Sequence, residues 1–117
     1  MSKSLELRDA TGIDVLLWVL RRRSRVKVTG RSMTPLFQPG DELLVNPFAY
    51  QQSLPQMGDI VVAWHPQREG FKLIKRIVDI TIDGYWLEGD NPNESTDSRS
   101  FGAIPVTSIL GKVVCRF

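Results

Sequence analysis

The chain has 117 residues, of which 42% are apolar and 24% charged, a composition typical of one globular domain. A single histidine and a single cysteine exclude an internal disulfide and leave no metal-binding cluster. The net charge of +2 hides a basic segment: residues 21–31 carry six positive and no negative charges, and the remainder carries nine positive and thirteen negative ones. Such a segment is typical of a solvated basic surface, or of one that meets an anionic membrane, a nucleic acid or an acidic peptide.

Residues 1–24 are predicted to form an N-terminal tail and one amphipathic helix. The tail, residues 1–10, is polar and mixed in charge. Thr11 is a suitable N-cap and Asp14 completes a capping box, so we expect a helix over residues 12–23. Its last turn would hold three consecutive arginines, because cations interact favourably with the C-terminal end of the helix dipole.

This helix carries a wide apolar sector. Ile13, Leu16, Leu17 and Leu20 recur at helical spacing, and Trp18 widens the sector. Two interpretations stay open: the helix packs on a sheet, or it lies on a membrane surface or beside a substrate groove. The apolar run is shorter than the roughly 20 residues that cross a bilayer. We therefore expect no membrane-spanning anchor and a cytoplasmic protein, either soluble or peripherally bound to a membrane.

From residue 25 to residue 117 the pattern is that of β-structure, in which short apolar runs alternate with Gly and Pro turns. The expected strands are residues 25–29, 42–46, 60–64, 71–80, 85–88 and 112–116. Residues 89–100 form a polar loop without periodicity, and Gly111 is expected to end a short apolar segment that begins at Val106. The pattern predicts a mainly β catalytic domain: a compact, folded or barrel-like antiparallel sheet with one N-terminal helix.

Lys75 is the residue of the longest expected strand that does not fit its surroundings. Strand alternation places it on the same face as Leu73 and Ile77. A lysine buried among aliphatic side chains has a lowered pKa and can act as a general base. Ser32, in the turn after the first strand, is the hydroxyl that such a base would activate. The alternative is a lysine whose stem packs while its ammonium group reaches water.

Three other reactive groups fit catalysis less well. Ser24 and Lys27 have the S-x-x-K spacing of penicillin-binding enzymes, but that motif requires a helix and this segment is turning into a strand. His65 lies in an expected hairpin loop and is interpreted as a surface histidine. Cys115, near the end of an apolar strand, is interpreted as a small core residue.

Four short motifs occur along the chain. They are Gly30–Pro35 (Gly-x-Ser-Met-x-Pro), Gly58–Val62 (Gly-Asp before an apolar run), Ile74–Val78 (around the lysine) and Gly89–Gly102 (Gly-Asp-Asn, then Ser-x-Asp-Ser-Arg and Gly). In this order they resemble the sequence boxes of type I signal peptidases, serine endopeptidases that use a Ser/Lys dyad. Four boxes together are far more specific than any one of them.

The resemblance implies that Ser32 is the nucleophile and Lys75 the general base. The backbone N–H of Ser32 would donate to the oxyanion, and Met33 belongs to the same site-supporting motif. Gly30 stands where many bacterial members carry a second hydroxyl donor. That contribution would therefore be absent or come from elsewhere.

The last motif supplies supporting residues by the same resemblance. Ser95 would hydrogen-bond to the catalytic lysine and orient it. Asp97 and Arg99 would form an ion pair that supports the site. The resemblance implies neither a metal ion nor a cofactor.

The chain is more compact than many signal peptidases, because only residues 76–88 separate the lysine from the last motif. No large second β-domain is therefore expected. This compact form resembles the maturation proteases of nickel-type superoxide dismutase, which remove a short N-terminal propeptide so that the new N-terminal amine can bind nickel. The resemblance implies a protein substrate of that kind, the nickel superoxide dismutase precursor.

Three alternatives stay open beside this reading. The first is a general leader peptidase that works at a membrane surface through the N-terminal helix and the arginine cluster. The second is a nucleic-acid-binding β-barrel, disfavoured because residues 21–31 hold no aromatic side chain. The third is a self-cleaving repressor-type Ser/Lys domain, disfavoured because the short chain leaves no room for a DNA-binding domain.

Overall fold

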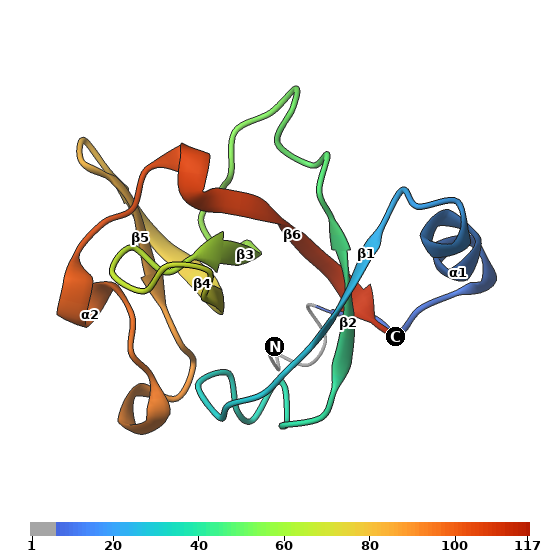
Figure 1. Ribbon diagram of the computed structural model, residues 1–117, viewed down its shortest axis with the longest axis horizontal. Coiled ribbons are helices and arrows are strands. Elements are labelled where there is room, and N and C mark those ends of the chain that lie inside the picture. The colour runs from blue at the N-terminus through green and yellow to red at the C-terminus, as the bar shows by residue number, and fades with distance from the viewer. Residues whose placement is uncertain (1–6) are drawn as a thin grey trace.

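The computed structural model describes residues 7–117 and is built on one six-stranded sheet (Figure 1). The strands are β1 (Ser24–Lys27), β2 (Glu42–Asn46), β3 (Ile60–Trp64), β4 (Lys72–Thr81), β5 (Gly84–Glu88) and β6 (Ile109–Arg116). Their order is β1-β2-β6-β3-β4-β5, and all neighbouring pairs run antiparallel. The other elements are helix α1 (Gly12–Val19), the helical turn α2 (Ser98–Phe101), and the 3-10 turns η2 (Pro92–Glu94) and η3 (Val106–Ser108). The predicted mainly β fold with an N-terminal helix is confirmed, while residues 1–6 of the expected tail lie outside the described residues.

Strand β3 separates two apolar clusters because successive side chains of a strand point to opposite faces. Ile60 and Val62 belong to one cluster, together with Met33 and Phe37 from the turn after β1. Val61 and Ala63 belong to the other, together with side chains of β4 and β5. All four core residues of β3 are buried, which explains why this strand is a continuous apolar run.

Two turns of the same kind start β2 and β3. Gly40 and Gly58 have φ values of 95° and 91°, in the left-handed region that favours glycine. The aspartate that follows each glycine accepts a hydrogen bond from a backbone N–H three residues upstream, at 2.8 Å for Asp41 and 3.1 Å for Asp59. The repeated Gly-Asp pair of the sequence is therefore one turn used twice.

Helix α1 is shorter than the predicted helix over residues 12–23. The capping box is present, since Asp14 accepts from the backbone N–H of Thr11 at 2.8 Å. The helix ends at Val19, and Arg21 has a φ of 62°, which turns the chain toward β1. The three arginines therefore follow the helix instead of forming its last turn. None of the helices in residues 7–117 is long and apolar enough to cross a bilayer.

Strand β6 is longer than predicted because Gly111 does not end the apolar segment. The strand runs through Gly111, which lies against the end of β2 and the residue after it. A Cβ atom at Gly111 would be 2.7 Å from a methyl carbon of Val45 and 2.8 Å from the carbonyl oxygen of Asn46. Glycine is required here for close packing of two chain segments, a role that looks the same as a turn in the sequence.

Substitution Gly111→Ala is expected to lower the free energy of unfolding by about 1–3 kcal/mol, because the added methyl group overpacks this crossing. Urea unfolding followed by circular dichroism measures the change. Gly12→Ala is the matched control, since a Cβ at Gly12 meets nothing within 4 Å. Equal stability of the two variants would contradict the packing argument.

Candidate active site

Ser32 lies in a tight turn that continues from the sheet. Strand β1 ends two residues earlier than expected, but Val28 still pairs with the segment before β2, since its N–H donates to the carbonyl oxygen of Asp41 at 2.8 Å. Beyond it, the backbone N–H of Thr34 donates to Arg31 at 3.1 Å. Met33 is 2% exposed, so the residue that follows Ser32 is anchored in the core and fixes the turn.

The last motif, Gly89–Gly102, is hydrogen-bonded to this turn. The backbone N–H of Asn91 donates to the carbonyl oxygen of Ser32 at 2.8 Å, and the Asn91 side-chain amide donates to the hydroxyl of Thr34 at 2.8 Å. A Cβ atom at Gly89 would lie 2.6 Å from the same carbonyl oxygen of Ser32. Only glycine allows this approach, so Gly89 and Asn91 together fix the position of the Ser32 backbone.

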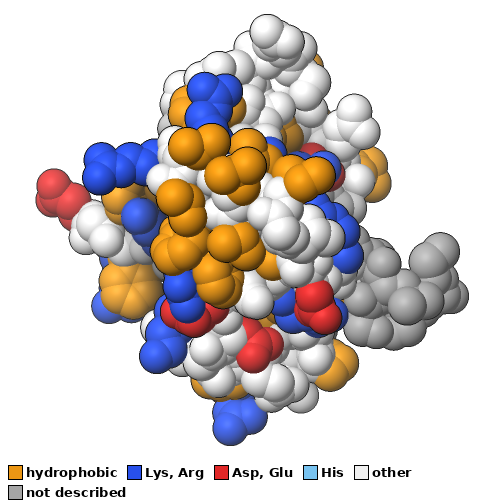
Figure 2. All heavy atoms as spheres, turned by 90° about the vertical axis from the view of Figure 1, so that its right-hand side faces the viewer, with side chains coloured by type: hydrophobic (Ala, Val, Ile, Leu, Met, Phe, Trp, Pro, Cys, Tyr) orange, Lys and Arg blue, Asp and Glu red, His pale blue; other side chains and the backbone are white. Residues whose placement is uncertain are grey.

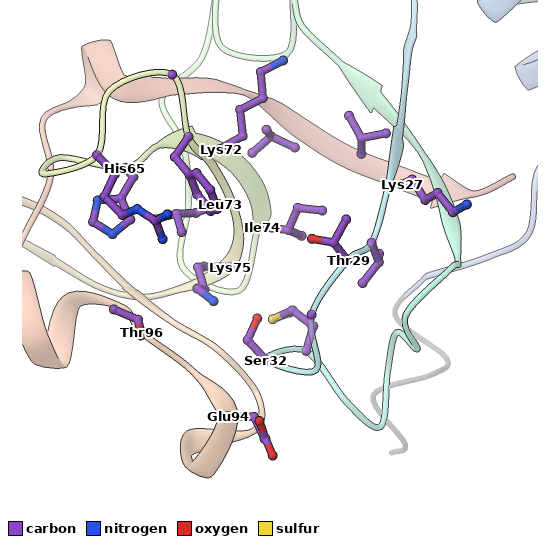
Figure 3. Close-up of a pocket in the computed structure, with 18 residues that line it drawn as sticks. Lys27, Thr29, Ser32, His65, Lys72, Leu73, Ile74, Lys75, Glu94 and Thr96 are labelled. Atoms are coloured by element: carbon purple, nitrogen blue, oxygen red, sulfur yellow. The ribbon is translucent and has the colours of Figure 1, made fainter.

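Lys75 comes from β4 and is 4% exposed. Its face is the predicted one, since Leu73 and Ile77 are also buried, and its cross-strand neighbour is the buried Val61. Figure 3 shows the side chains of Lys75 and Ser32 pointing toward one another from opposite sides of a pocket. The structure thus brings together the two residues that the sequence singled out.

Burial lowers the pKa of Lys75 from its ordinary value. The negative charge of Asp97 acts in the opposite direction, and the positive charge of Arg99 adds to the lowering. Desolvation is the largest of these influences. The neutral amine, the form in which lysine can accept a proton, is therefore favoured relative to a lysine in water.

Asp97 is the centre of a hydrogen-bond network beside Lys75. Its carboxylate is 1% exposed and accepts from the backbone N–H of Gly89 at 2.9 Å, from the Arg99 guanidinium at 2.6 Å and from the Ser95 hydroxyl. It also caps helical turn α2 by accepting from the backbone N–H of Arg99 at 3.1 Å. Burial alone would raise the pKa of Asp97, but these hydrogen bonds outweigh it and hold the pKa well below its usual range.

The expected Asp97–Arg99 ion pair is therefore present, and it orders part of the loop that looked structureless in the sequence. The hydroxyl of Ser95 donates its hydrogen bond to Asp97. Its oxygen lone pairs stay available to accept from an amine, so the direct Ser95–Lys75 hydrogen bond stays a prediction.

Arg76, next to Lys75 on β4, forms a second link to the last motif. Its guanidinium donates to Asp90 at 3.0 and 3.1 Å and to the carbonyl oxygen of Gly58 at 3.3 Å. This bidentate pair with Asp90, together with the contact to Gly58, connects three of the four motifs.

The pocket between the two residues has a volume of about 600 Å³. Its lining includes Gly30, Ser32, Met33 and Lys75, and residues 26–29 and 72–74 form its long walls. The side chain of Thr29 points into it, as Figure 3 shows. Gly30, the position at which many bacterial family members carry a second hydroxyl donor, contributes backbone only. The hydroxyl nearest to it in the sequence belongs to Thr29.

His65 is the pocket residue that the sequence interpretation missed. It is half-buried in the pocket wall, with its ring 5.3 Å from that of Phe101, and its Nδ1 accepts from the backbone N–H of Gln67 at 3.0 Å. Burial lowers the pKa of His65, and the charges of Arg68 and Lys75 lower it further. Its position depends on the fold of the 65–71 hairpin, which the sequence does not specify in detail.

The other reactive groups lie elsewhere. Ser24 and Lys27 are both in β1, a strand and not the helix that the S-x-x-K motif requires. Cys115 is fully buried in β6, and burial raises the pKa of its thiol, which disfavours a reactive thiolate. Within residues 7–117, no three His, Cys, Asp or Glu side chains are grouped so that they could hold a metal ion.

A serine facing a buried lysine across a pocket can supply a nucleophile and a base. Comparison with known proteins identifies the family. The model of the family "Signal peptidase, peptidase S26" matches residues 10–81 and 78–117. The chain belongs to the signal peptidase family.

Relatives include mitochondrial and bacterial proteins. Mitochondrial inner membrane protease subunit 1 of Xenopus tropicalis is 32% identical over 108 residues, covering 75% of this chain and 65% of the relative. Subunit 2 of the same protease from Danio rerio is 31% identical over 123 residues, covering 86% and 67%. A probable signal peptidase I-1 of Synechocystis sp. is 31% identical over 131 residues, covering 74% and 66%. The match thus spans about two thirds of the length of these relatives.

Substitution Asp97→Asn is expected to lower the free energy of unfolding by about 2–3 kcal/mol at pH 7, because it weakens the hydrogen bonds that Arg99 and Gly89 make to the buried carboxylate. A carboxylate whose folded pKa is depressed stabilises the protein above its unfolded pKa. The free energies of unfolding of the variant and the wild type should therefore become more similar as the pH falls below about 4.

Urea unfolding at pH 7 and at acidic pH measures this effect. Asp83→Asn, in the exposed β4–β5 turn, is the control that changes the same chemical group without losing a buried carboxylate. A loss of stability that stayed constant across this pH range would contradict the role assigned to the Asp97 charge.

Proposed function

We propose that this protein is a serine endopeptidase that removes N-terminal leader segments from precursor proteins, with Ser32 as nucleophile and Lys75 as general base. The observation that carries the proposal is a lysine, 4% exposed and with a lowered pKa, facing a serine across an open pocket. The dense bonding of the Ser32 turn and the Asp97 network supports it, because catalytic groups need a fixed geometry.

In this mechanism the neutral amine of Lys75 takes the proton of the Ser32 hydroxyl as Oγ attacks the carbonyl carbon of the substrate. The backbone N–H of Ser32 donates to the oxyanion that forms. Lys75 then gives its proton to the departing amine, which leaves an acyl-enzyme. Water, deprotonated by the same lysine, attacks the ester and releases the acid and the free Ser32.

The pocket favours an extended peptide. Strand β1 pairs with β2 along one edge and stands at the end of the sheet order, so its other edge is open toward the pocket. A substrate strand lying between residues 26–30 and residues 72–75 could hydrogen-bond to that backbone. Pocket side chains would then select among substrates, while the main-chain bonds hold the scissile bond beside Ser32.

The family supports a general leader peptidase more than a narrower role. Relatives named as mitochondrial inner membrane proteases and as a signal peptidase make leader removal near a membrane the favoured activity. Processing of a nickel superoxide dismutase precursor is the narrower candidate. The feature in its favour is the direct β4–β5 hairpin, which leaves no second β-domain between Lys75 and Gly89.

The test is cleavage of a panel of precursors that includes bacterial-type leader sequences and a nickel superoxide dismutase precursor, read as new N-termini by mass spectrometry. Ser32→Ala and Lys75→Arg are expected to lose at least about a thousandfold of kcat, because one lacks the nucleophile and the other has a base that stays protonated. Lys112→Arg, on β6 outside the pocket, should keep wild-type activity. Cleavage by Ser32→Ala at the wild-type rate would overturn the proposal.

The pH profile provides a second prediction. Because burial lowers the pKa of Lys75, kcat/KM should rise from neutral toward alkaline pH, with a midpoint below the ordinary lysine pKa of 10.5. Asp97 opposes this lowering. In Asp97→Asn the rise should therefore move to lower pH. Initial rates on a peptide substrate measure both profiles, and a flat wild-type profile would exclude the lysine as base.

A further inference from the structure

The solvent-facing side of helix α1 is apolar. Ile13, Leu16, Val19 and Leu20 are 71%, 55%, 62% and 60% exposed. At about 100° per residue they fall within one sector of the helix about 120° wide. Figure 2 shows hydrophobic side chains gathered into a patch on this side of the molecule. We call these four residues, with Val15, the α1 patch.

The side of α1 that faces the protein holds its only charged residue. Asp14 is 4% exposed, and its carboxylate accepts from the guanidinium of Arg8 at 2.8 Å. The hydrogen bonds from Arg8 keep the pKa of Asp14 well below its usual range. Trp18 packs edge-on against Phe117, with ring centroids 4.9 Å apart. The helix is therefore held by an ion pair and an aromatic contact, with the reverse of the usual orientation of an amphipathic helix.

This orientation makes the interpretation in which the apolar face packs on the sheet wrong. Of the four residues that the sequence offered for such packing, Ile13, Leu16 and Leu20 are on the surface, and Leu17 is half-buried. A contiguous exposed apolar patch on a soluble domain marks a surface that meets another apolar phase.

Basic residues border the patch. Arg21 and Arg22 are exposed and follow α1 directly, and the Arg22 guanidinium lies 5.1 Å from the ring centroid of Phe48. Arg25 lies 3.9 Å from the ring centroid of Phe117. Two guanidinium groups near α1 thus lie over aromatic rings, and such a combination of rings and cations is typical of helices at a lipid–water interface.

Three acidic groups in this region are paired with arginines. Asp14 of α1 is paired with Arg8, Glu42 of β2 with Arg25, and the exposed Asp9 with Arg116. The hydrogen bond from Arg25 also lowers the pKa of Glu42. Arg21 and Arg22, which are exposed and follow α1 directly, therefore give this border a positive charge that complements a negatively charged plane.

We propose that the α1 patch and its arginine border are a docking surface for an anionic lipid bilayer. Helix α1 lies parallel to the membrane, with Leu16 and Val19 in the acyl region and Arg21 and Arg22 among the headgroups. A bilayer fits this surface better than a protein groove partner does, because the exposed sector is wide, contains no acidic or hydrogen-bonding side chain, and has cations at its border.

The residues of the docking surface directly precede, in the sequence, residues that line the pocket. Strand β1 leads from the arginines to residues 26–30, which form one wall of the pocket. Docking through α1 would therefore hold the pocket close to the membrane plane, where leader segments are presented. The inference extends the proposed leader-peptidase function, but its test needs no proteolysis.

The test is flotation of the Ser32→Ala protein, in which proposed catalysis is blocked, with vesicles of phosphatidylcholine alone or mixed with phosphatidylglycerol. We expect binding to the anionic vesicles that weakens as salt rises. The double variant Leu16→Glu, Val19→Glu should bind at least about tenfold more weakly. Replacement of Arg21 or Arg22 by glutamine should weaken binding about fivefold each.

Ile82→Glu is the matched control, because Ile82 is fully exposed at the tip of the β4–β5 hairpin, away from α1. It should bind like the parent, and circular dichroism should show that all variants are folded. Failure of the parent to bind anionic vesicles, or undiminished binding by the Leu16, Val19 variant, would overturn the proposal. A dimer of the parent protein in light scattering that the double variant does not form would also overturn the proposal, because a second copy would then cover the patch.

Peptide cleavage in the absence of vesicles separates this result from the proposed function. With Ser32 restored, the Leu16, Val19 variant should cleave a soluble peptide at the wild-type rate, because neither residue lines the pocket. Loss of vesicle binding with retained cleavage supports the docking surface. Vesicle binding by a protein that cleaves no precursor would leave the docking surface supported and the peptidase function overturned.

Discussion

The desolvation of one amine is the constraint on which the site depends. Lys75 is placed by strand alternation on the buried face of β4, opposite Val61 and between Leu73 and Ile77. Its aliphatic surroundings disfavour the ammonium form relative to water, and its pKa falls. The same burial that makes the strand stable therefore prepares the lysine to accept a proton.

The neighbouring charges limit that effect and fix the geometry. Asp97 is close enough to oppose the lowering of the lysine pKa, but its carboxylate is already engaged by Arg99, Ser95 and Gly89. A carboxylate with these partners is a weaker counter-charge to an amine than an isolated one would be. The network thus holds the last motif in place, and the net shift of the Lys75 pKa stays downward.

The four motifs are physically one unit. Asn91 and Gly89 contact the backbone of Ser32, and Arg76 joins Asp90 to the turn at Gly58. Each contact is between segments far apart in the chain. Several other residues of the motifs are explained by these contacts, which fix the backbone segments that carry Ser32 and Lys75. At the other end of the molecule, α1 is held by Asp14 and Trp18 and leaves its apolar side to solvent.

The sequence by itself determined the local features. Short apolar runs after Gly-Asp turns identified β2 and β3 to the residue, and alternation identified the buried face of Lys75. The Gly-Asp pairs and the capping box identified turns and a helix start, because these features depend on neighbours in the chain. Only the tertiary structure decided that Gly111 allows a close crossing, that His65 lines the pocket, and that α1 turns its carboxylate inward. Each of these depends on which distant segment lies opposite, such as Asn46 against Gly111 or Arg8 against Asp14, and a one-dimensional pattern does not contain that information.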